Sequence, residues 1–335
     1  MTDSVDIAEF SFSGHAGVGS ARVPDFFLAG HPKCGTTALY EMLRAHPQIF
    51  MPEVKEPRYF ASDMRQRFQP SRSGALPVTL DEYLALFEDA RPDQRMGEAS
   101  PSYLASHTAA GLIAEVQPAA RIVAILREPA SFLYSLHQQL LRSHVESEKD
   151  LRTAMALEQA RSEGRHIPRR SHRPGALQYS DHVRYVEQLR RYEAVFPREQ
   201  MLVLIYDDFR AENEDTVRTV MRFLGVDDTV EVDVHDANPA VRVRSQRLDE
   251  LVHLVSVGRG PVAKAAKTAI NAAIPARARR RALQATRRHL VYGRPQQPDP
   301  RFVAELRHRF KGEVVALSEH LNRDLVGEWG YDSVD

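Results

Sequence analysis

Short hydrophobic runs alternate along this chain with segments whose apolar residues recur at helical spacing. The first run, residues 23–30 with the sequence VPDFFLAG, ends in a glycine. In the segment from Thr37 to Ala45 that follows, leucine and methionine residues recur three and four positions apart, as on one face of a helix. The pattern predicts a strand, a turn and a helix, in that order.

The alternation of strand and helix returns twice further along the chain. Residues 121–126, RIVAIL, form a β-branched run that precedes an amphipathic segment at residues 131–141. Residues 201–206, MLVLIY, form a third run, and a helix is predicted over residues 216–224 before a glycine. Strands that alternate with helices pair in parallel and bury both faces of their sheet. We therefore predict an α/β protein with a three-layer, P-loop-like fold, in which helices flank a central parallel β-sheet.

The length of 335 residues fits either one or two domains at about 150 residues each. We predict one domain, residues 23–335, because α/β enzymes of this size often fold around one sheet. Residues 1–22 are polar and punctuated by glycine, which predicts a flexible N-terminal tail. After Pro300 we expect a helix whose core face is formed by Val303, Leu306, Phe310, Val314, Leu317 and Leu321.

Positive and negative charges balance over the whole chain but not along it. The sequence has 45 Lys and Arg against 45 Asp and Glu, and this zero net charge argues against a nucleic-acid-binding protein. Residues 251–298, however, contain ten Lys and Arg and no Asp or Glu. We predict a basic helical insertion there, which is either a solvated surface, a site for an anionic substrate or carrier, or a docking surface for anionic lipid.

Three features of the sequence bear on the location of the protein. No stretch approaches the roughly 20 uninterrupted apolar residues that a membrane-spanning helix needs. The first ten residues carry acids where a secretory signal would carry bases, and the one cysteine, Cys34, leaves no partner for an internal disulfide. Together these features predict a cytoplasmic protein.

The first predicted turn, residues 30–37 with the sequence GHPKCGTT, has the composition of an anion-binding loop. Its glycines allow backbone N–H groups to converge, and the helix that follows presents its positive dipole end to the same point. Unlike the nucleotide-triphosphate P-loop, this loop carries its lysine inside, at Lys33, and has Thr36 where that motif requires lysine. The alternative is an ordinary glycine turn with an exposed Lys33. Cys34 is interpreted as a small residue that the turn accepts, although a helix terminus would also favour a reactive thiolate.

Residues 32–37, PKCGTT, resemble the 5′-phosphosulfate loop of the PAPS-dependent sulfotransferases, in particular the bacterial and Golgi-type, heparan-sulfate-sulfotransferase-like branch. Further segments that resemble the family in the same order are residues 55–60, KEPRYF, residues 97–103, GEASPSY, and residues 204–209, LIYDDF. The resemblance assigns nine residues to binding of the nucleotide: Pro32, Lys33, Cys34, Gly35, Thr36, Thr37, Arg127, Ser135 and Tyr206.

Arg127 and Ser135 match the family's second signature, an arginine that ends a strand and a serine eight residues later. PAPS carries a 3′-phosphate that ordinary nucleotides lack; a guanidinium group binds it bidentately while a hydroxyl donates from the next helix. Alternatively, Arg127 caps its strand and Ser135 bonds its own helix backbone. Tyr206 matches a position that contacts adenine in the cytosolic branch, or else packs in the core. That branch carries an aromatic residue where this chain has Ala38, so stacking on adenine must differ here.

The resemblance also implies a general base for the acceptor. In Golgi-type and bacterial members the base is a glutamate after the first helix, and Glu56 occupies that position; burial would raise its pKa toward neutrality. The alternative is a surface carboxylate paired with Lys55 or Arg58. Glu98 is the second candidate for the base, and Lys33 is expected to stabilise charge on the bridging phosphate oxygen.

Some relatives carry a lysine that helps to hold the sulfuryl group where this chain has Ala99. We expect Arg58 or His31 to replace it. The sequence shows no constellation of metal ligands, although Asp207 and Asp208, which follow the third hydrophobic run, are candidates for an acidic strand end that binds a metal. Sulfuryl transfer depends mainly on positioning and charge stabilisation, so we predict that no metal is needed.

The resemblance therefore implies a PAPS-dependent sulfotransferase, EC 2.8.2.-, that transfers a sulfuryl group to a hydroxyl or amine and releases PAP. The acceptor is left open among small molecules, glycans, lipids and natural products, with no nucleic acid, and residues 251–298 are a candidate contact for anionic lipid or a carrier. Residues 146–173 are a candidate acceptor lid. The alternatives are a P-loop kinase of small molecules or nucleosides, and a non-catalytic nucleotide-binding protein.

Overall fold

A computed structural model describes residues 22–64, 76–169, 171, 174–232, 242–243, 292–293 and 298–334. The predicted tail lies outside the described residues except for Arg22, whose guanidinium group donates to the carbonyl oxygens of Arg91 at 2.8 Å and Gln94 at 2.6 Å. The basic segment 251–298 also lies outside them, apart from residues 292–293 and 298.

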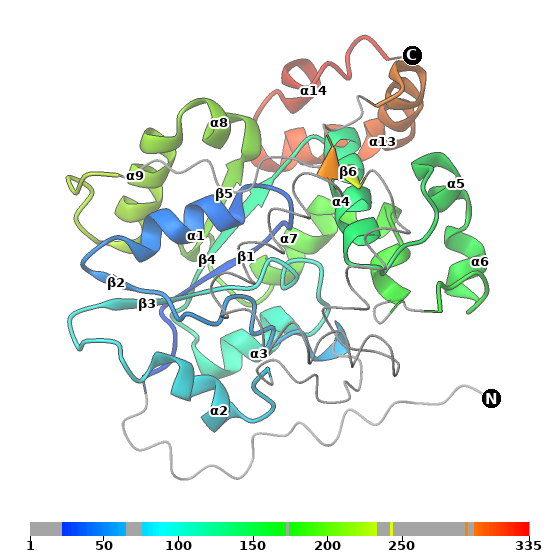
Figure 1. Ribbon diagram of the computed structural model, residues 1–335. Helices are drawn as coiled ribbons and strands as arrows, with labels where there is room; N and C mark the ends of the chain where they lie inside the picture. Colours follow the sequence, from blue (N-terminus) through cyan, green and yellow to red (C-terminus); the bar gives the residue numbers. More distant parts are fainter. Residues whose placement is uncertain are drawn as a thin grey trace.

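A parallel sheet of five strands forms the centre of the described structure (Figure 1). Its order is β2-β3-β1-β4-β5, and each neighbouring pair is parallel. The strands are β1 (Phe26–Gly30), β2 (Ile49–Phe50), β3 (Arg95–Ala99), β4 (Arg121–Leu126) and β5 (Met201–Ile205). A separate antiparallel pair joins β6 (Arg242–Val243) to β7 (Tyr292–Gly293).

Helices connect the strands and cover both faces of the sheet. Those of the first half are α1 (Thr36–Arg44), α2 (Leu80–Leu84), α3 (Ala109–Val116), α4 (Pro129–Arg142), α5 (Leu151–Ala156) and α6 (Glu158–Ser162). Those of the second half are α7 (Tyr185–Glu193), α8 (Tyr206–Ala211), α9 (Asn213–Leu224), α13 (Pro300–Leu321) and α14 (Leu325–Glu328). Short 3₁₀ turns are η2 (Ser62–Met64), η3 (Ala85–Phe87), η4 (Pro174–Leu177), η5 (Ser180–Val183) and η6 (Arg198–Gln200).

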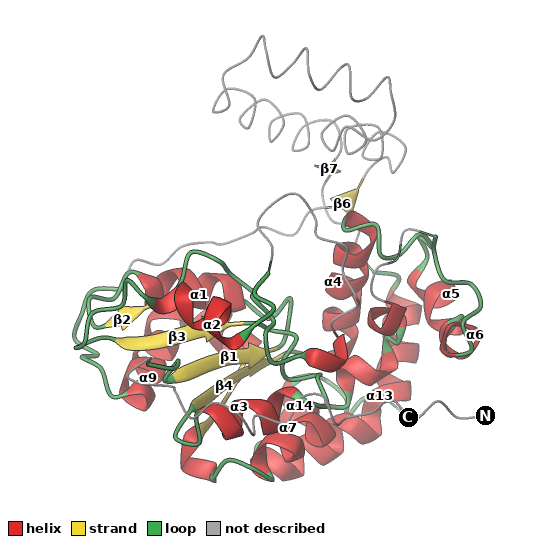
Figure 2. Cartoon of the chain, turned by 90° about the horizontal axis from the view of Figure 1, so that it is seen from below, coloured by secondary structure: helices red, strands yellow, loops and turns green. Residues whose placement is uncertain are grey.

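The elements form the three layers that the alternating pattern predicts. Helices α1 and α9 pack together on one face of the sheet, and α3 and α7 pack together on the other (Figures 1 and 2). The long helix α13 packs against both α4 and α7 and buries four of its six predicted core residues fully. Within the described ranges, no helix is both long and apolar enough to cross a membrane.

Three of the five strands of the sheet follow from the hydrophobic runs, and two do not. Strand β4 has the predicted bounds, whereas β1 begins three residues later than its run. Strand β3, RMGEA, lacks an apolar run because its centre is Gly97. A Cβ atom at Gly97 would lie 2.1 Å from the Phe26 ring and 2.5 Å from the Met51 sulfur, so neighbouring side chains fill the space that a larger residue would need.

The predicted lid, residues 146–173, is anchored by a buried ion pair. The Arg161 guanidinium donates to both carboxylate oxygens of Glu146, at 2.7 and 2.9 Å, and both side chains are almost fully buried. The Tyr179 hydroxyl donates to the same carboxylate at 3.0 Å and lies 2.8 Å from His137 Nδ1 on α4. The start of the segment is thus fixed to α4 through a satisfied polar network.

Replacement of Arg161 by methionine should lower the free energy of unfolding by about 3 kcal/mol or more, because the Glu146 charge would stay buried without its partner. Urea unfolding followed by circular dichroism measures the change. The control is Arg165→Met, which breaks an ion pair with Glu163 in which both side chains are largely exposed; its effect should stay below about 1 kcal/mol. Equal losses in the two variants would contradict the importance of the buried pair.

Candidate functional site

The loop from β1 to α1 has the geometry of an anion site. Lys33 and Gly35 adopt left-handed backbone conformations, with φ of 67° and 82°. A Cβ atom at Gly35 would lie 2.8 Å from the ring of Phe209, so this position requires glycine for both φ and space. Gly35 provides no side-chain cap for α1, and the first turn of α1 has no acidic residue. The first N–H groups of the helix therefore remain available to an anion.

Arg127 follows directly after β4 and joins the loop to a third segment. Its Nη1 donates to the carbonyl oxygen of Lys33 at 3.2 Å, and its guanidinium carbon lies 4.6 Å from the centre of the Tyr206 ring. Its Nε donates to Ser131 Oγ at 3.0 Å. Ser135 lies one helical turn further along α4 and is half-buried. The fold therefore brings Lys33, Arg127 and Tyr206 together, and Ser131 is a partner of Arg127 that the sequence did not reveal.

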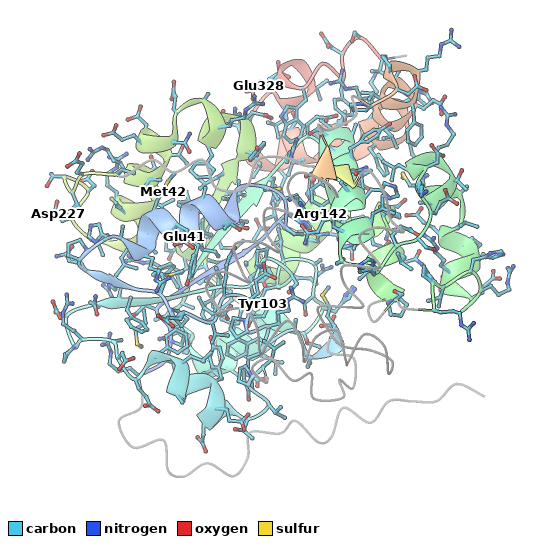
Figure 3. All side chains as sticks on the ribbon, viewed as in Figure 1. Glu41, Met42, Tyr103, Arg142, Asp227 and Glu328 are labelled. Atoms are coloured by element: carbon cyan, nitrogen blue, oxygen red, sulfur yellow. The ribbon has the colours of Figure 1, made fainter. Side chains whose placement is uncertain are left out.

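Positive charge accumulates around Lys33. Burial lowers the pKa of Lys33 to about 8, and the charges of Arg142, Arg127 and Lys55 lower it in the same direction. Arg142 lies in the last turn of α4 (Figure 3). Lys55 Nζ donates to Thr37 Oγ1 in the first turn of α1. Several cations at close range, on a site that is partly withdrawn from water, create a strong local preference for an anion.

Lys55 and Arg142 belong to this cluster although the sequence analysis assigned neither of them to the nucleotide site. Lys55 lies within the segment 55–60 that resembles the family and is one of only six lysines in the chain, so it carried a weak signal. Arg142 carried none, because only the packed course of α4 places its charge close enough to affect Lys33.

Cys34 is a buried residue of the turn rather than a reactive thiol. Its side chain is fully buried, and its Sγ lies 3.6 Å from the carbonyl oxygen of Pro32. Burial raises the pKa of the thiol to about 12 despite the nearby charges of Arg127 and Lys33. The thiolate that reaction requires is therefore scarce at neutral pH.

Glu56 lies next to the C-terminal end of β3, the strand that pairs with β1. Its backbone N–H donates to Ala99 O at 3.1 Å, and the N–H of Arg58 donates to Ser100 Oγ at 2.9 Å. Arg58 Nη2 donates to Glu56 Oε2, with 30% of the Arg58 side chain and 33% of the Glu56 side chain exposed. Of the two alternatives for Glu56, the pairing with Arg58 is present, and the carboxylate still reaches solvent. A carboxylate in this position is accessible to an acceptor.

Glu98 does not fit the role of a second candidate base. Its side chain on β3 is fully buried, and the Tyr83 hydroxyl donates to Glu98 Oε2 at 3.1 Å. Burial raises its pKa to about 7, against the opposing effect of hydrogen bonds from Ser100, Tyr103 and Tyr83. An acceptor atom cannot approach a carboxyl group enclosed in this way, so the structure favours Glu56.

His31 does not fit the expected contact with a sulfuryl group. Its ring is fully buried, with Nε2 2.5 Å from Gln188 Oε1 on α7 and the Phe132 ring at 5.1 Å. Burial, followed by the charge of His182, lowers its pKa to about 3, so His31 is neutral at physiological pH. Of the two expected replacements for the missing lysine, Arg58 is the one that is partly exposed.

Asp207 and Asp208, the candidate metal ligands after the third hydrophobic run, bind the C-terminal part of the chain. Trp329 Nε1 donates to Asp207 Oδ2 at 3.1 Å, and Arg323 donates to both oxygens of Asp208, at 2.5 and 2.9 Å. These contacts give Asp207 and Asp208 a structural role.

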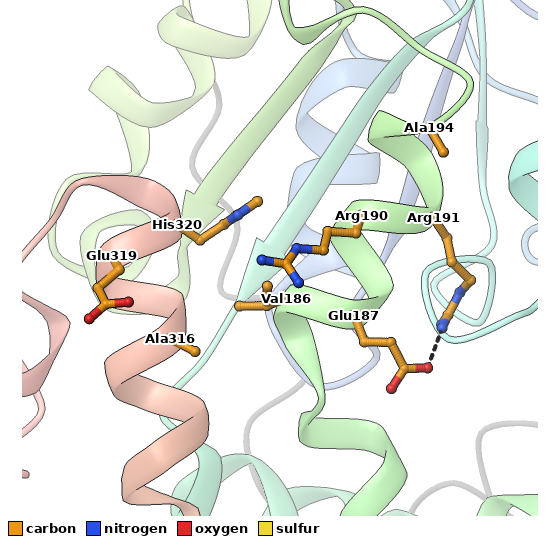
Figure 4. Close-up of a pocket in the computed structure, with 8 residues that line it drawn as sticks. All are labelled: Val186, Glu187, Arg190, Arg191, Ala194, Ala316, Glu319 and His320. Carbon is orange, nitrogen blue, oxygen red and sulfur yellow. Dashed lines mark hydrogen bonds and ion pairs between the residues drawn. The ribbon is translucent and has the colours of Figure 1, made fainter.

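A groove of about 770 Å³ lies between α7 and α13 (Figure 4). Val186 and Arg190 of α7 face Ala316 and His320 of α13 across it. None of the residues predicted to bind the nucleotide lines this groove, so it does not contribute to the candidate site.

Comparison with known proteins adds an independent line of evidence. Residues 23–255 match the family model described as "Sulfotransferase domain". Human carbohydrate sulfotransferase 15 is 31% identical over an alignment of 153 residues, and the match covers 34% of this chain and 26% of that protein. Human bifunctional heparan sulfate N-deacetylase/N-sulfotransferase 3 is 29% identical over 213 residues, 61% of this chain and 22% of that protein. The chain thus matches less than half of the length of these relatives.

Among solved structures, a sulfotransferase from Alicyclobacillus acidocaldarius has a TM-score of 0.65 and 25% sequence identity. The match covers 92% of this chain and 99% of that one. It is consistent with the parallel sheet and the loop-to-helix arrangement described above.

The burial of Cys34 predicts that the native protein resists alkylation. Iodoacetamide at pH 8 should leave the folded chain unmodified over an hour, because the thiol is enclosed and its pKa is raised to about 12. Intact-mass spectrometry measures the modification. In guanidinium chloride the same reagent should modify the one cysteine completely. Rapid alkylation of the folded chain would show that the loop opens.

Proposed function

We propose that this chain, which belongs to the sulfotransferase family, transfers a sulfuryl group from PAPS to a hydroxyl or amine group and releases PAP. The position of Arg127 carries the proposal. Its guanidinium group hydrogen-bonds the carbonyl of Lys33 in the anion loop and lies over the Tyr206 ring. A nucleotide with phosphates at two positions would find donors for both at one point of the fold.

The loop and Arg127 are proposed to hold different phosphates of the donor. The free N–H groups at the start of α1, with Lys33 and Thr37, suit the 5′-phosphosulfate. Arg127 with Ser135 suits the 3′-phosphate, because a planar guanidinium group binds two phosphate oxygens at once. Tyr206, whose ring lies against the Arg127 guanidinium group, is proposed to contact the adenosine.

In the proposed reaction the acceptor oxygen or nitrogen attacks sulfur, in line with the bond from sulfur to the 5′-phosphate. As the new bond forms, the old sulfur–oxygen bond breaks and its electron pair stays on the phosphate oxygen of PAP. The ammonium group of Lys33 stabilises this charge, and Glu56 accepts the proton of the acceptor. The chain thus supplies positioning, charge stabilisation and a base.

A glycan is the acceptor that the comparisons favour. Relatives are named for carbohydrate and heparan sulfate. The cations near Lys33 add a physical reason, because carboxylate or sulfate groups on a glycan would be attracted to Arg142 and Lys55.

The proposed function is tested by incubating the protein with PAPS carrying radioactive sulfur and a panel of sulfated and unsulfated glycans. We expect label to move to a glycan. Replacement of Glu56 by glutamine should lower turnover at least about 100-fold, because proton transfer is lost, while the affinity for PAP stays within twofold.

The matched control is Glu53→Gln, which alters a carboxylate of the same segment whose side chain is 92% exposed. Its turnover should equal that of the unchanged protein. If Glu56→Gln retained full turnover on the labelled acceptor, Glu56 would not be the base; if no panel member accepted label while PAP bound tightly, the glycan class would be wrong.

The affinity for PAP should fall as pH rises above about 8, because the free protein then loses the proton of Lys33, whose pKa is about 8. A bound phosphate favours the charged amine and raises that pKa, so binding at pH 9 should take up a proton. Calorimetric titration in two buffers of different ionisation enthalpy measures the uptake.

Lys33→Met should abolish both the pH dependence in this range and the proton uptake. The control Lys149→Met, at an exposed lysine, should change neither. An affinity that stayed constant from pH 7 to pH 9.5 would exclude Lys33 from phosphate binding.

A further inference from the structure

The C-terminal part of the chain contacts residues that directly follow those of the candidate donor site. Helices α13 and α14 lie after residue 255, where the match to the family model ends. Figure 1 shows α14, in red, on the same side of the molecule as α8. The Tyr331 hydroxyl donates to Glu128 Oε1 at 2.9 Å, and Trp329 Nε1 donates to Asp207 Oδ2 at 3.1 Å. Glu128 and Asp207 are the residues directly after Arg127 and Tyr206.

Glu128 connects Tyr331 to Arg127 through Ser131. Its Oε2 accepts the backbone N–H of Ser131 at 2.7 Å and so caps α4. The Ser131 hydroxyl donates to the carbonyl oxygen of Glu128 at 3.0 Å and accepts from Arg127 Nε at 3.0 Å. A continuous series of hydrogen bonds therefore runs from Tyr331 to the guanidinium group of Arg127.

The contacts at Glu128 are buried and charge-assisted. Tyr331 is fully buried and Glu128 is 8% exposed. Arg307 of α13 lies 3.5 Å from Glu128 Oε1 and 5.7 Å from the centre of the Tyr331 ring. Burial and the negative charge of Glu128 raise the pKa of Tyr331, which keeps its hydroxyl protonated as the donor. Hydrogen bonds to an ionised group in such surroundings are stronger than those between neutral groups.

The segment that carries Tyr331 is itself fixed in two further ways. Arg323, between α13 and α14, binds both oxygens of Asp208 at 2.5 and 2.9 Å. Ser318 Oγ on α13 accepts the backbone N–H of Leu325 at 2.8 Å, which ties α14 to α13. These contacts hold α14 and the residues around it, and so they help to fix the position of the Tyr331 hydroxyl.

We propose that Tyr331 is a positioning residue for the donor nucleotide: through Glu128 and Ser131 it holds the guanidinium group of Arg127 in the orientation that receives the 3′-phosphate. The proposal rests on the proposed function, since it assigns Arg127 to that phosphate. It gives the C-terminal segment a role in selecting a 3′-phosphorylated nucleotide, in addition to its packing on α4 and α7.

Packing alone and positioning make different demands on Tyr331. Packing needs the aromatic ring, whereas positioning needs the hydroxyl group. Tyr331→Phe removes only the hydroxyl and therefore separates the two roles. AMP, which lacks the 3′-phosphate, separates them again, because a loss of general stability would weaken PAP and AMP alike.

The experiment measures the dissociation constants of PAP and AMP by calorimetric titration of the full chain. For Tyr331→Phe we expect PAP to bind about tenfold more weakly, as for the loss of one hydrogen bond to a charged group, and AMP to stay within twofold. The control is Tyr192→Phe, which removes a buried hydroxyl that makes no hydrogen bond within the described residues. It should change neither constant.

Arg127→Ala serves as the reference and should abolish the preference for PAP over AMP. If it leaves that preference intact, the proposed donor site is wrong. If it abolishes the preference but Tyr331→Phe does not reduce it, the inference about Tyr331 is overturned while the donor site stands.

The route through Ser131 is tested by combining Tyr331→Phe with Ser131→Ala. Both changes act on the same series of hydrogen bonds. The double variant should therefore lose little more PAP affinity than the single variant that has the larger loss. Fully additive losses would contradict this route. Trp329→Phe, which acts next to Tyr206 instead, should weaken PAP and AMP by the same factor; a loss confined to PAP would also contradict the division of roles.

Discussion

The guanidinium group of Arg127 joins the three segments from which the candidate site is built. It donates to the loop after β1, extends from the end of β4, and lies over the tyrosine that follows β5. These strands are parallel neighbours or next neighbours in the sheet, so their C-terminal ends meet at one edge. The order of the strands therefore brings the three segments together at one edge of the sheet, where Arg127 contacts the other two.

This arrangement has an energetic cost that a bound anion would relieve. Lys33 is half-buried with three other cations near it, and its lowered pKa reflects both effects. The first N–H groups of α1 have no side-chain cap. A ligand with two phosphates would neutralise these charges and satisfy these donors together, so the repulsion between the cations supports the proposed binding of a bisphosphate nucleotide. The buried network behind Arg127 keeps the cationic group in place before the ligand arrives.

The sequence alone predicted much of the frame and part of the site. Runs of apolar residues predicted β1, β4 and β5. Motif spacing singled out Lys33 and Arg127, which the structure joins through the hydrogen bond from Arg127 to the Lys33 carbonyl oxygen. Strand β3 was missed because Gly97 and Glu98 interrupt its apolar character. Glu98 looked like a candidate base because spacing carries no information on burial. The sequence could not predict the roles of Ser131, Arg142 and Tyr331, because their relation to Arg127 or Lys33 depends on helix orientation and on contacts between residues up to 203 positions apart.

The proposed binding of the nucleotide can be tested by a crystal structure of the chain with PAP bound. We expect the 5′-phosphate within hydrogen-bond distance of the N–H groups of residues 35–37, and the 3′-phosphate within hydrogen-bond distance of two nitrogens of Arg127. A nucleotide bound elsewhere, or bound in this place with the 3′-phosphate turned toward solvent and Arg127 untouched, would contradict it.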